Sequence, residues 1–146
     1  MIKLVKPLFV LIIVTAFFSF TTEENTINWV SIEEAQASVK ENPKAIFIDF
    51  SAQWCGWCKV MDKKTFSDET VASYMNENFY PCRLDYDSKE VFEFFGEKYT
   101  ARQLGEKYKV PGLPTILLIS ADNKKSKTLV GYKNPDQFLP KLKSFN

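Results

Sequence analysis

The sequence predicts an α/β fold with a central mixed β-sheet flanked by helices, and three observations lead to this prediction. An apolar, β-branched and aromatic run at 45–50 is typical of a buried strand, and a helical segment at 59–66 follows it closely. A second strand-like run lies at 79–85. The pattern of 115–130 is strand, turn and strand, and a closing helix follows. Strands that alternate with helices and end in a hairpin form one sheet with parallel and antiparallel pairs.

The first helix is expected to begin after Ser31 and to stop at 42–43. Ser31 and Glu34 have the spacing of a capping box, and apolar residues then recur at helical spacing. Another helix is expected to start at Ser67 and to lead into the second strand. Pro81 predicts that this strand begins just after the proline, because proline has no N–H to donate to a neighbouring strand.

Two short helices are expected within 88–108, broken at Gly96, which makes an extended helical connection before the proline-rich turn at 110–114. Asn134 and Pro135 are typical of the N-cap and first turn of the closing helix. The connection carries an aromatic cluster, interpreted either as the packed face of an extra helix or as a partner-docking surface: Phe92, Phe94, Phe95 and Tyr99.

Length, composition and charge indicate one folded domain. A chain of 146 residues with 45% hydrophobic residues can bury a single core. The 19 basic and 18 acidic residues leave a net charge of +1, and the lysines are scattered along the chain. This balance argues against a nucleic-acid partner.

The N-terminus has the layout of a secretory signal. Lys3 and Lys6 precede an uncharged, mostly apolar run at 7–20, which is short for a membrane span. The cleavage site at 19–21 matches the small-x-small pattern only loosely. A cleaved signal and a membrane anchor formed by residues 4–20 are both open interpretations.

The resulting domain boundaries are a signal peptide or anchor at 1–21, a polar lead-in at 22–28 and the folded domain at 29–146. The folded part is therefore expected outside the cytoplasm, periplasmic or secreted, where disulfides are made and maintained.

The stretch Trp54-Cys55-Gly56-Trp57-Cys58-Lys59 carries the chemistry. Two cysteines separated by two residues can cycle between dithiol and disulfide. A strand, a turn and a helix put Cys55 at the helix N-terminus, where unpaired N–H groups and the helix dipole favour a thiolate. Cys55 is therefore expected to be the more exposed cysteine and the nucleophile that forms a mixed disulfide, which Cys58 then resolves.

A CxxC pair can also serve as a structural staple or as part of a metal site. A disulfide that closes so short a loop removes little entropy from the unfolded chain, so a structural staple would stabilise weakly. A closed four-ligand zinc site within one chain is excluded, because the chain has no histidine and only one further cysteine, Cys82. A metal or iron–sulfur site shared by two chains stays open. Cys82 is interpreted as a small buried apolar residue rather than a third redox thiol.

Asp49 is the candidate proton acceptor for Cys58. Its carboxylate stands in an otherwise apolar strand beneath the motif, and burial would raise its pKa towards a useful value. The alternative is a side chain on the solvent-facing side of the strand.

These motifs together resemble the thioredoxin-like superfamily. Ile48-Asp49-Phe50 leads into the CxxC motif, and the turn at 110–115 and Gly131 follow in the family's order. The resemblance covers 29–146 and implies the thioredoxin fold. The stretch 58–74 is similar to exported members such as the C-terminal domain of the thiol:disulfide interchange protein DsbD.

The resemblance also implies roles for residues outside the motif. Pro114 corresponds to the family's cis-proline, which would lie against the cysteines and leave the Leu113 backbone free to pair with a substrate segment. An ordinary trans turn proline is the alternative. Arg83 stands where thioredoxins carry a lysine, and its permanent charge would tend to keep Asp49 ionised. Arg83 could equally be an ordinary charged residue on a sheet face.

Trp54, Gly56 and Trp57 are expected to form part of the substrate-binding surface around the sulfurs, although Trp54 could instead pack into the core. Trp57 stands where thioredoxin has a proline, and residues between the cysteines affect the redox potential. The motif therefore leaves the direction of electron flow open.

The resemblance implies a thiol:disulfide oxidoreductase that uses no cofactor and acts as a monomer on protein or peptide disulfides. Reduction is favoured over oxidation or isomerisation. Electrons would come from an unidentified thiol donor, with a membrane protein as one candidate. The alternatives are a non-catalytic partner-binding module and a metal-handling dimer.

Overall fold

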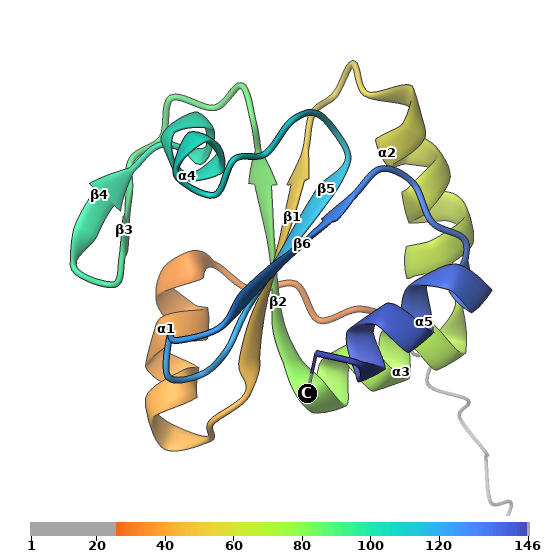
Figure 1. Cartoon of the computed structure of the whole chain (residues 1–146), viewed down its shortest axis with the longest axis horizontal. Helices are drawn as coiled ribbons and strands as arrows, with labels where there is room; N and C mark the ends of the chain where they lie inside the picture. Colours follow the sequence, from red (N-terminus) through yellow and green to blue (C-terminus); the bar gives the residue numbers. More distant parts are fainter. Residues whose placement is uncertain (1–25, 146) are drawn as a thin grey trace, which may run out of the picture.

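The computed structural model describes residues 26–145, and its centre is a four-stranded sheet (Figure 1). The strand order is β2-β1-β5-β6, with bounds β1 Ala45–Ser51, β2 Phe79–Asp85, β5 Thr115–Ile119 and β6 Ser126–Val130. β1 pairs in parallel with β2 and antiparallel with β5, and β5 pairs antiparallel with β6. The predicted mixed sheet is confirmed.

Helices cover both faces of this sheet (Figure 1). One face carries α1 Ile32–Glu41 and α4 Ala101–Lys107, and the other carries α2 Gly56–Met61, the π-helical turn η1 Asp62–Phe66, α3 Glu69–Asn78 and α5 Pro135–Lys143. The Ser31 hydroxyl caps α1 by accepting from the N–H of Glu34, as the sequence predicts. The predicted helix at 59–66 begins earlier, at Gly56, because Cys55 itself is the N-cap residue.

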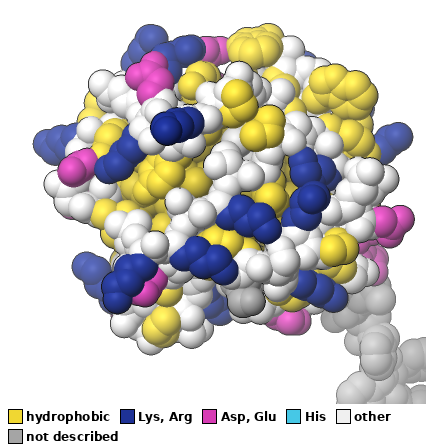
Figure 2. Space-filling view, viewed as in Figure 1, with side chains coloured by type: hydrophobic (Ala, Val, Ile, Leu, Met, Phe, Trp, Pro, Cys, Tyr) yellow, Lys and Arg dark blue, Asp and Glu magenta, His cyan; other side chains and the backbone are white. Residues whose placement is uncertain are grey.

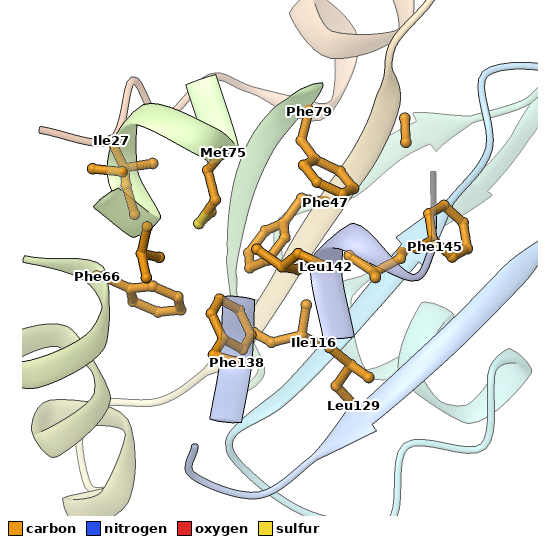
Figure 3. Close-up of a cluster of buried hydrophobic side chains, with 14 of the residues drawn as sticks. Ile27, Phe47, Phe66, Met75, Phe79, Ile116, Leu129, Phe138, Leu142 and Phe145 are labelled. Atoms are coloured by element: carbon orange, nitrogen blue, oxygen red, sulfur yellow. The ribbon is translucent and has the colours of Figure 1, made fainter. Parts of the chain in front are cut away.

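The core is divided between these two faces. β1 is buried on both sides, so its residues alternate between the two clusters: Phe47 faces α3 and α5, whereas Ile46 and Ile48 face α1. Phe47 lies at the centre of the first cluster, with the rings of Phe66 and Phe138 each about 6 Å away and edge-on (Figure 3). This packing anchors the strand that leads to the cysteines.

The prediction of a helix in the first half of the connection is wrong. The segment is a β-hairpin, with β3 Phe92–Phe94 and β4 Glu97–Tyr99. Phe92 and Phe94 point inwards and alternate with exposed Glu93, which is strand rather than helix periodicity. Phe95 and Gly96 form the two-residue turn with φ of 49° and 84°, the positive pair that tight hairpins need.

The hairpin is held by the neighbouring helix. The amide of Gln36 in α1 donates to the carbonyl of Glu93 and accepts from the N–H of Phe95. Buried Phe92 and Phe94 join the cluster under α1 and α4. Phe92 and Phe94 therefore pack into the core from a strand and Tyr99 packs against it, whereas Phe95 stays exposed. Only α4 of the two predicted helices forms.

Two predicted boundaries also change. β2 begins at Phe79 and contains Pro81, because β2 is an edge strand whose outer side needs no N–H at that position. The carbonyl of Pro81 accepts from Val30 on this outer side. Ile27 packs into the core, so the packed domain starts before Trp29. The predicted signal or anchor at 1–21 lies outside the described residues, and within 26–145 no helix is long and apolar enough to cross a membrane.

Candidate active site

Cys55 and Cys58 form a disulfide where β1 gives way to α2. Their Cα atoms are 5.3 Å apart, and the sulfur of Cys55 accepts a hydrogen bond of 3.1 Å from the N–H of Cys58. Cys55 is thus the N-cap of the helix, as the sequence predicts. In a reduced protein this position would favour its thiolate, since helix N–H groups point at the sulfur.

The expectation that Cys55 is the more exposed cysteine is wrong for this oxidised form. Cys55 is 4% exposed and Cys58 is 5% exposed. Both pack with Ala52 in a small cluster that Leu113 covers. Gly56, between them, lies at the surface with open space around its Cα.

Leu113 and Pro114 bring the second loop of the site to the disulfide. Their peptide bond is cis, as the resemblance implies, and the Leu113 side chain packs on the two cysteines. The carbonyl of Pro114 accepts from the N–H of Gly131 at 2.9 Å, which ties the loop to the end of β6. Within residues 26–145 the Leu113 backbone N–H and C=O have no hydrogen-bond partner, so an extended peptide can pair with them.

Asp49 is buried, with 2% of its surface exposed, so the solvent-facing alternative is wrong. It lies on the face of β1 that α2 covers, where Met61, one helical turn after Cys58, joins the core. Burial raises the pKa of Asp49 to about 6, although the charge and hydrogen bond of Arg83 lower it. Its Oδ1 has no hydrogen-bond partner among the described residues.

Arg83 lies opposite Asp49 on β2 and forms an ion pair with it, so the alternative of an ordinary charged residue on a sheet face is wrong. Its Nε donates to Oδ2 of Asp49 at 2.8 Å and its Nη2 donates to Oδ1 of Asp62 at 2.5 Å. The guanidinium also lies 4.2 Å from the ring centroid of Trp29. The cation is therefore shared between a buried carboxylate and a half-exposed one.

Sequence reasoning missed Asp62. This residue stands four positions after Cys58 on one continuous helical stretch, and its backbone N–H bonds to the carbonyl of Cys58. The negative charge of Asp62 also raises the pKa of Asp49. An acidic residue one helical turn after the second cysteine was the available signal.

Trp54 is 69% exposed, so the alternative that it packs into the core is wrong. Its indole N–H donates to Asp87 at 2.6 Å, and the other oxygen of Asp87 accepts from Arg102 at 2.8 Å. Arg102 in turn lies over the ring of Tyr86. Neither Asp87 nor Arg102 was expected in the site, and no local pattern marks them.

Trp57 is 60% exposed and stacks on Tyr132, with ring centroids 5.5 Å apart and planes at 25°. Tyr132 follows Gly131, the residue bonded to the proline loop, and this adjacency could have pointed to it. The disulfide is therefore bracketed by two exposed indoles, each held by a different part of the fold.

Cys82 takes no part in this arrangement. It is fully buried on β2, and burial raises its pKa to about 12, with smaller contributions from Glu33 and Glu34. A thiolate is therefore disfavoured there, which confirms the interpretation as a small buried apolar residue. Within the described part of the chain, no three His, Cys, Asp or Glu side chains gather where they could hold a metal ion.

Comparison with known proteins shows the family and the fold of this chain. A family model described as a thioredoxin-like domain matches residues 32–146. The chain belongs to the thioredoxin-like domain family.

Among solved structures, a thioredoxin from Thermus thermophilus superposes with a TM-score of 0.67 at 21% identity, covering 82% of this chain and 87% of that one. The oxidised C-terminal domain of Neisseria meningitidis DsbD gives 0.60 at 24% identity, covering 78% and 91%. Both likenesses show the thioredoxin fold.

The thioredoxin-like domain is also similar in sequence to part of several thiol:disulfide interchange proteins. DsbD from Campylobacter jejuni is 29% identical over 112 residues, which is 77% of this chain and 18% of that protein. DsbD from Haemophilus influenzae is 31% identical over 118 residues, 78% of this chain and 19% of that protein. The chain thus spans about a fifth of the length of these relatives.

Proposed function

We propose that this protein is a thiol:disulfide oxidoreductase that acts on protein disulfides outside the cytoplasm, working as a reductase. The observation that carries the proposal is the Cys55–Cys58 pair at the start of α2, covered by Leu113 from a loop whose backbone is free to bind a peptide. The sequence similarity to thiol:disulfide interchange proteins supports it.

The reaction begins with the reduced pair. The Cys55 thiolate attacks one sulfur of a substrate disulfide, so a Cys55–substrate bond forms while the substrate's S–S bond breaks and its other sulfur leaves as a thiolate that takes a proton. Cys58 then gives its proton to Asp49 and attacks the sulfur of Cys55, which releases the second substrate sulfur. The protein is left with the Cys55–Cys58 disulfide seen in the structure.

Asp49 suits the second step because its pKa of about 6 leaves it ionised, yet still basic, at neutral pH. Arg83 tunes this basicity. The exposed indoles of Trp54 and Trp57 and the Leu113 backbone would hold an extended substrate segment across the sulfurs.

The proposal also covers where the protein acts, its oligomeric state and its electron donor. Residues 1–21 would direct export to the periplasm or beyond the cell, either as a cleaved signal or as an anchor at 4–20. The domain would act as a monomer, and a thiol donor, with a membrane protein as one candidate, would reduce the disulfide after each turnover.

Insulin reduction driven by dithiothreitol tests the activity. Cys55→Ser should abolish it, while Cys82→Ser, which changes a buried cysteine away from the site, is the matched control. Full activity of Cys55→Ser would contradict the assigned nucleophile. Partner binding that survives loss of both Cys55 and Cys58, without any reductase activity, would favour a non-catalytic binding module.

The equilibrium reduction potential tests the direction. It can be measured in dithiothreitol or glutathione buffers, with Trp54 and Trp57 fluorescence as the reporter. A value near that of thioredoxin, about −270 mV, would support a reductase, whereas a value of about −120 to −180 mV would assign oxidation or isomerisation instead.

A further inference from the structure

Lysines are scattered along the whole chain, yet the fold brings several of them onto one face. Six of them lie in β6, α5 and the adjoining turns, and only two acids, Asp122 and Asp136, accompany them in that stretch. Figure 2 shows basic side chains spread across the face formed by these elements. This group is called the lysine face: Lys124, Lys125, Lys127, Lys133, Lys141 and Lys143.

The charge of the lysine face is largely unneutralised. Lys124 is the one member with a carboxylate within 4 Å among the described residues, and that ion pair is long, at 3.8 Å. Lys127 donates instead to the Ser144 hydroxyl at 3.0 Å, and Lys133 donates to the carbonyl of Val130 at 2.5 Å. Uncharged oxygens leave these ammonium charges in place, so the face presents a positive potential.

Three cations elsewhere in the fold are neutralised by carboxylates. Arg83, Arg102 and Lys107 each form an ion pair with a carboxylate at 2.9 Å or less. On the Trp54 side of the disulfide, the charge of Arg102 is therefore offset by Asp87. Residues 121–145 hold six lysines and two acids, whereas residues 26–120 hold 11 basic and 14 acidic residues, so the excess positive charge lies in β6, α5 and the adjoining turns.

The lysine face is continuous with the candidate active site. Tyr132, which stacks on Trp57, lies directly before Lys133 in the chain. A hollow of about 560 Å³ lies beside it, lined by Tyr132, Lys133, Asp136, Gln137, Pro140 and Lys141. Burial, together with the charge of Lys141, lowers the pKa of Lys133, which is consistent with two cations facing the same hollow. A partner that contacts Trp57 and Tyr132 would therefore lie beside Lys133 and Lys141.

We propose that the lysine face is a docking surface for a protein partner that carries acidic side chains beside its own disulfide or dithiol. This inference rests on the proposed function, since it extends the same site. Charge complementarity would steer the partner so that its sulfurs approach Cys55 over Trp57 and Tyr132, and it would act mainly on the association rate.

A protein fits this surface better than a lipid bilayer. Asp136 places one negative charge among the lysines beside Tyr132, which suits a partner with charges at fixed positions rather than a uniformly anionic layer. A bilayer on this face would also cover Tyr132 and Trp57, which are needed on the open side of the disulfide.

Two synthetic peptides with the same intramolecular disulfide test the proposal, one flanked by glutamates and the other by lysines. Each is mixed with the reduced full chain, and the exchange rate is followed by tryptophan fluorescence. The acidic peptide should react about tenfold faster at low ionic strength. This preference should shrink to less than about twofold in roughly 0.5 M salt, because salt screens exposed charges.

Charge-reversal variants show which lysines cause the faster exchange with the acidic peptide. The double variant Lys127→Glu and Lys141→Glu should lose the preference for the acidic peptide. The matched double variant Lys40→Glu and Lys98→Glu, on α1 and β4 across the sheet from α5 (Figure 1), should keep it. If Lys127→Glu disturbs its bond to Ser144, the single variant Lys141→Gln should still reduce the preference.

The outcomes separate this inference from the proposed function. Equal rates for the two peptides, or a preference that the lysine variants do not change, would overturn the docking surface while the oxidoreductase stands. No exchange with either peptide would overturn both. Binding to phosphatidylglycerol vesicles that depends on the same lysines, together with equal peptide rates, would assign the face to a membrane and overturn the protein partner.

Discussion

Arg83 donates from its Nε to the buried carboxylate of Asp49 at 2.8 Å, across the parallel pair of β1 and β2. Even with this partner, burial keeps the pKa of Asp49 near 6. The pair therefore combines a buried acid that is costly to ionise with a cation that reduces the cost only in part.

This relationship predicts how stability depends on pH. The pKa of Asp49 is higher in the folded state, about 6, than its ordinary value of 3.8, so the folded state binds the proton more tightly. Asp49 therefore adds to the unfolding free energy below pH 4, and this contribution is lost as the pH rises to about 6. The loss is about 3 kcal/mol of unfolding free energy.

Asp49→Asn removes this titration. Between pH 4 and pH 7 the natural protein should lose about 3 kcal/mol of unfolding free energy that the variant does not lose. The unfolding free energy of the variant should therefore rise by that amount relative to the natural protein. Urea denaturation of both proteins at a series of pH values measures this difference. A difference that stays constant with pH would contradict the raised pKa of Asp49.

The same substitution should slow the resolving step of catalysis. Without the carboxylate, Cys58 loses its nearby proton acceptor, so release of substrate from the mixed disulfide should fall roughly 100-fold near neutral pH. Stopped-flow measurement of the released peptide thiol gives this rate. An unchanged rate above neutral pH would count against the role of Asp49.

Asp62→Asn should lower the pKa of Asp49. Asp62 shares the guanidinium of Arg83, and without its negative charge the cation would act on Asp49 more strongly. The carbon NMR signal of the Asp49 carboxyl, followed through a pH titration, measures the shift. Glu69→Gln, which removes an exposed charge from α3 away from Arg83, is the matched control and should leave the titration where it was.

Arg102→Ala should weaken substrate binding. Loss of the 2.8 Å ion pair frees Asp87, which then holds the indole of Trp54 less firmly. KM for a disulfide peptide should rise about fivefold with kcat little changed, as expected for about 1 kcal/mol of lost positioning. Lys107→Ala on the same helix, which breaks an ion pair with Glu97 instead, is the control. Equal effects of the two variants would contradict the specific role of Arg102.

Gly105→Ala should destabilise the fold. A Cβ at Gly105 would lie 2.6 Å from Cε2 of Tyr86, so the ring or α4 must move, at a cost of about 1–3 kcal/mol. Gly112→Ala, where a Cβ meets nothing within 4 Å, should change the unfolding free energy far less. Thermal denaturation of the two variants gives the comparison, and equal melting temperatures would show that α4 adjusts freely.

Much of the fold was predictable because its signals are local. The capping of α1 by Ser31, the buried run of β1 and the placement of Cys55 before a helix all depend on residues within a few positions of one another. The hairpin of β3 and β4 was not predicted, because strands of three residues carry little periodicity. This hairpin is also stabilised by Gln36, which lies far away in the sequence on α1.

Local patterns were enough to predict the order of the four strands of the central sheet, the CxxC pair at a helix start and an acid in a buried strand. The side chains that contact these groups come together only in the folded chain. Asp49 and Arg83 are 34 residues apart, and Trp54 and Asp87 are 33 apart. Such pairs become neighbours only when the strands align in one register, and local patterns carry no information about that register.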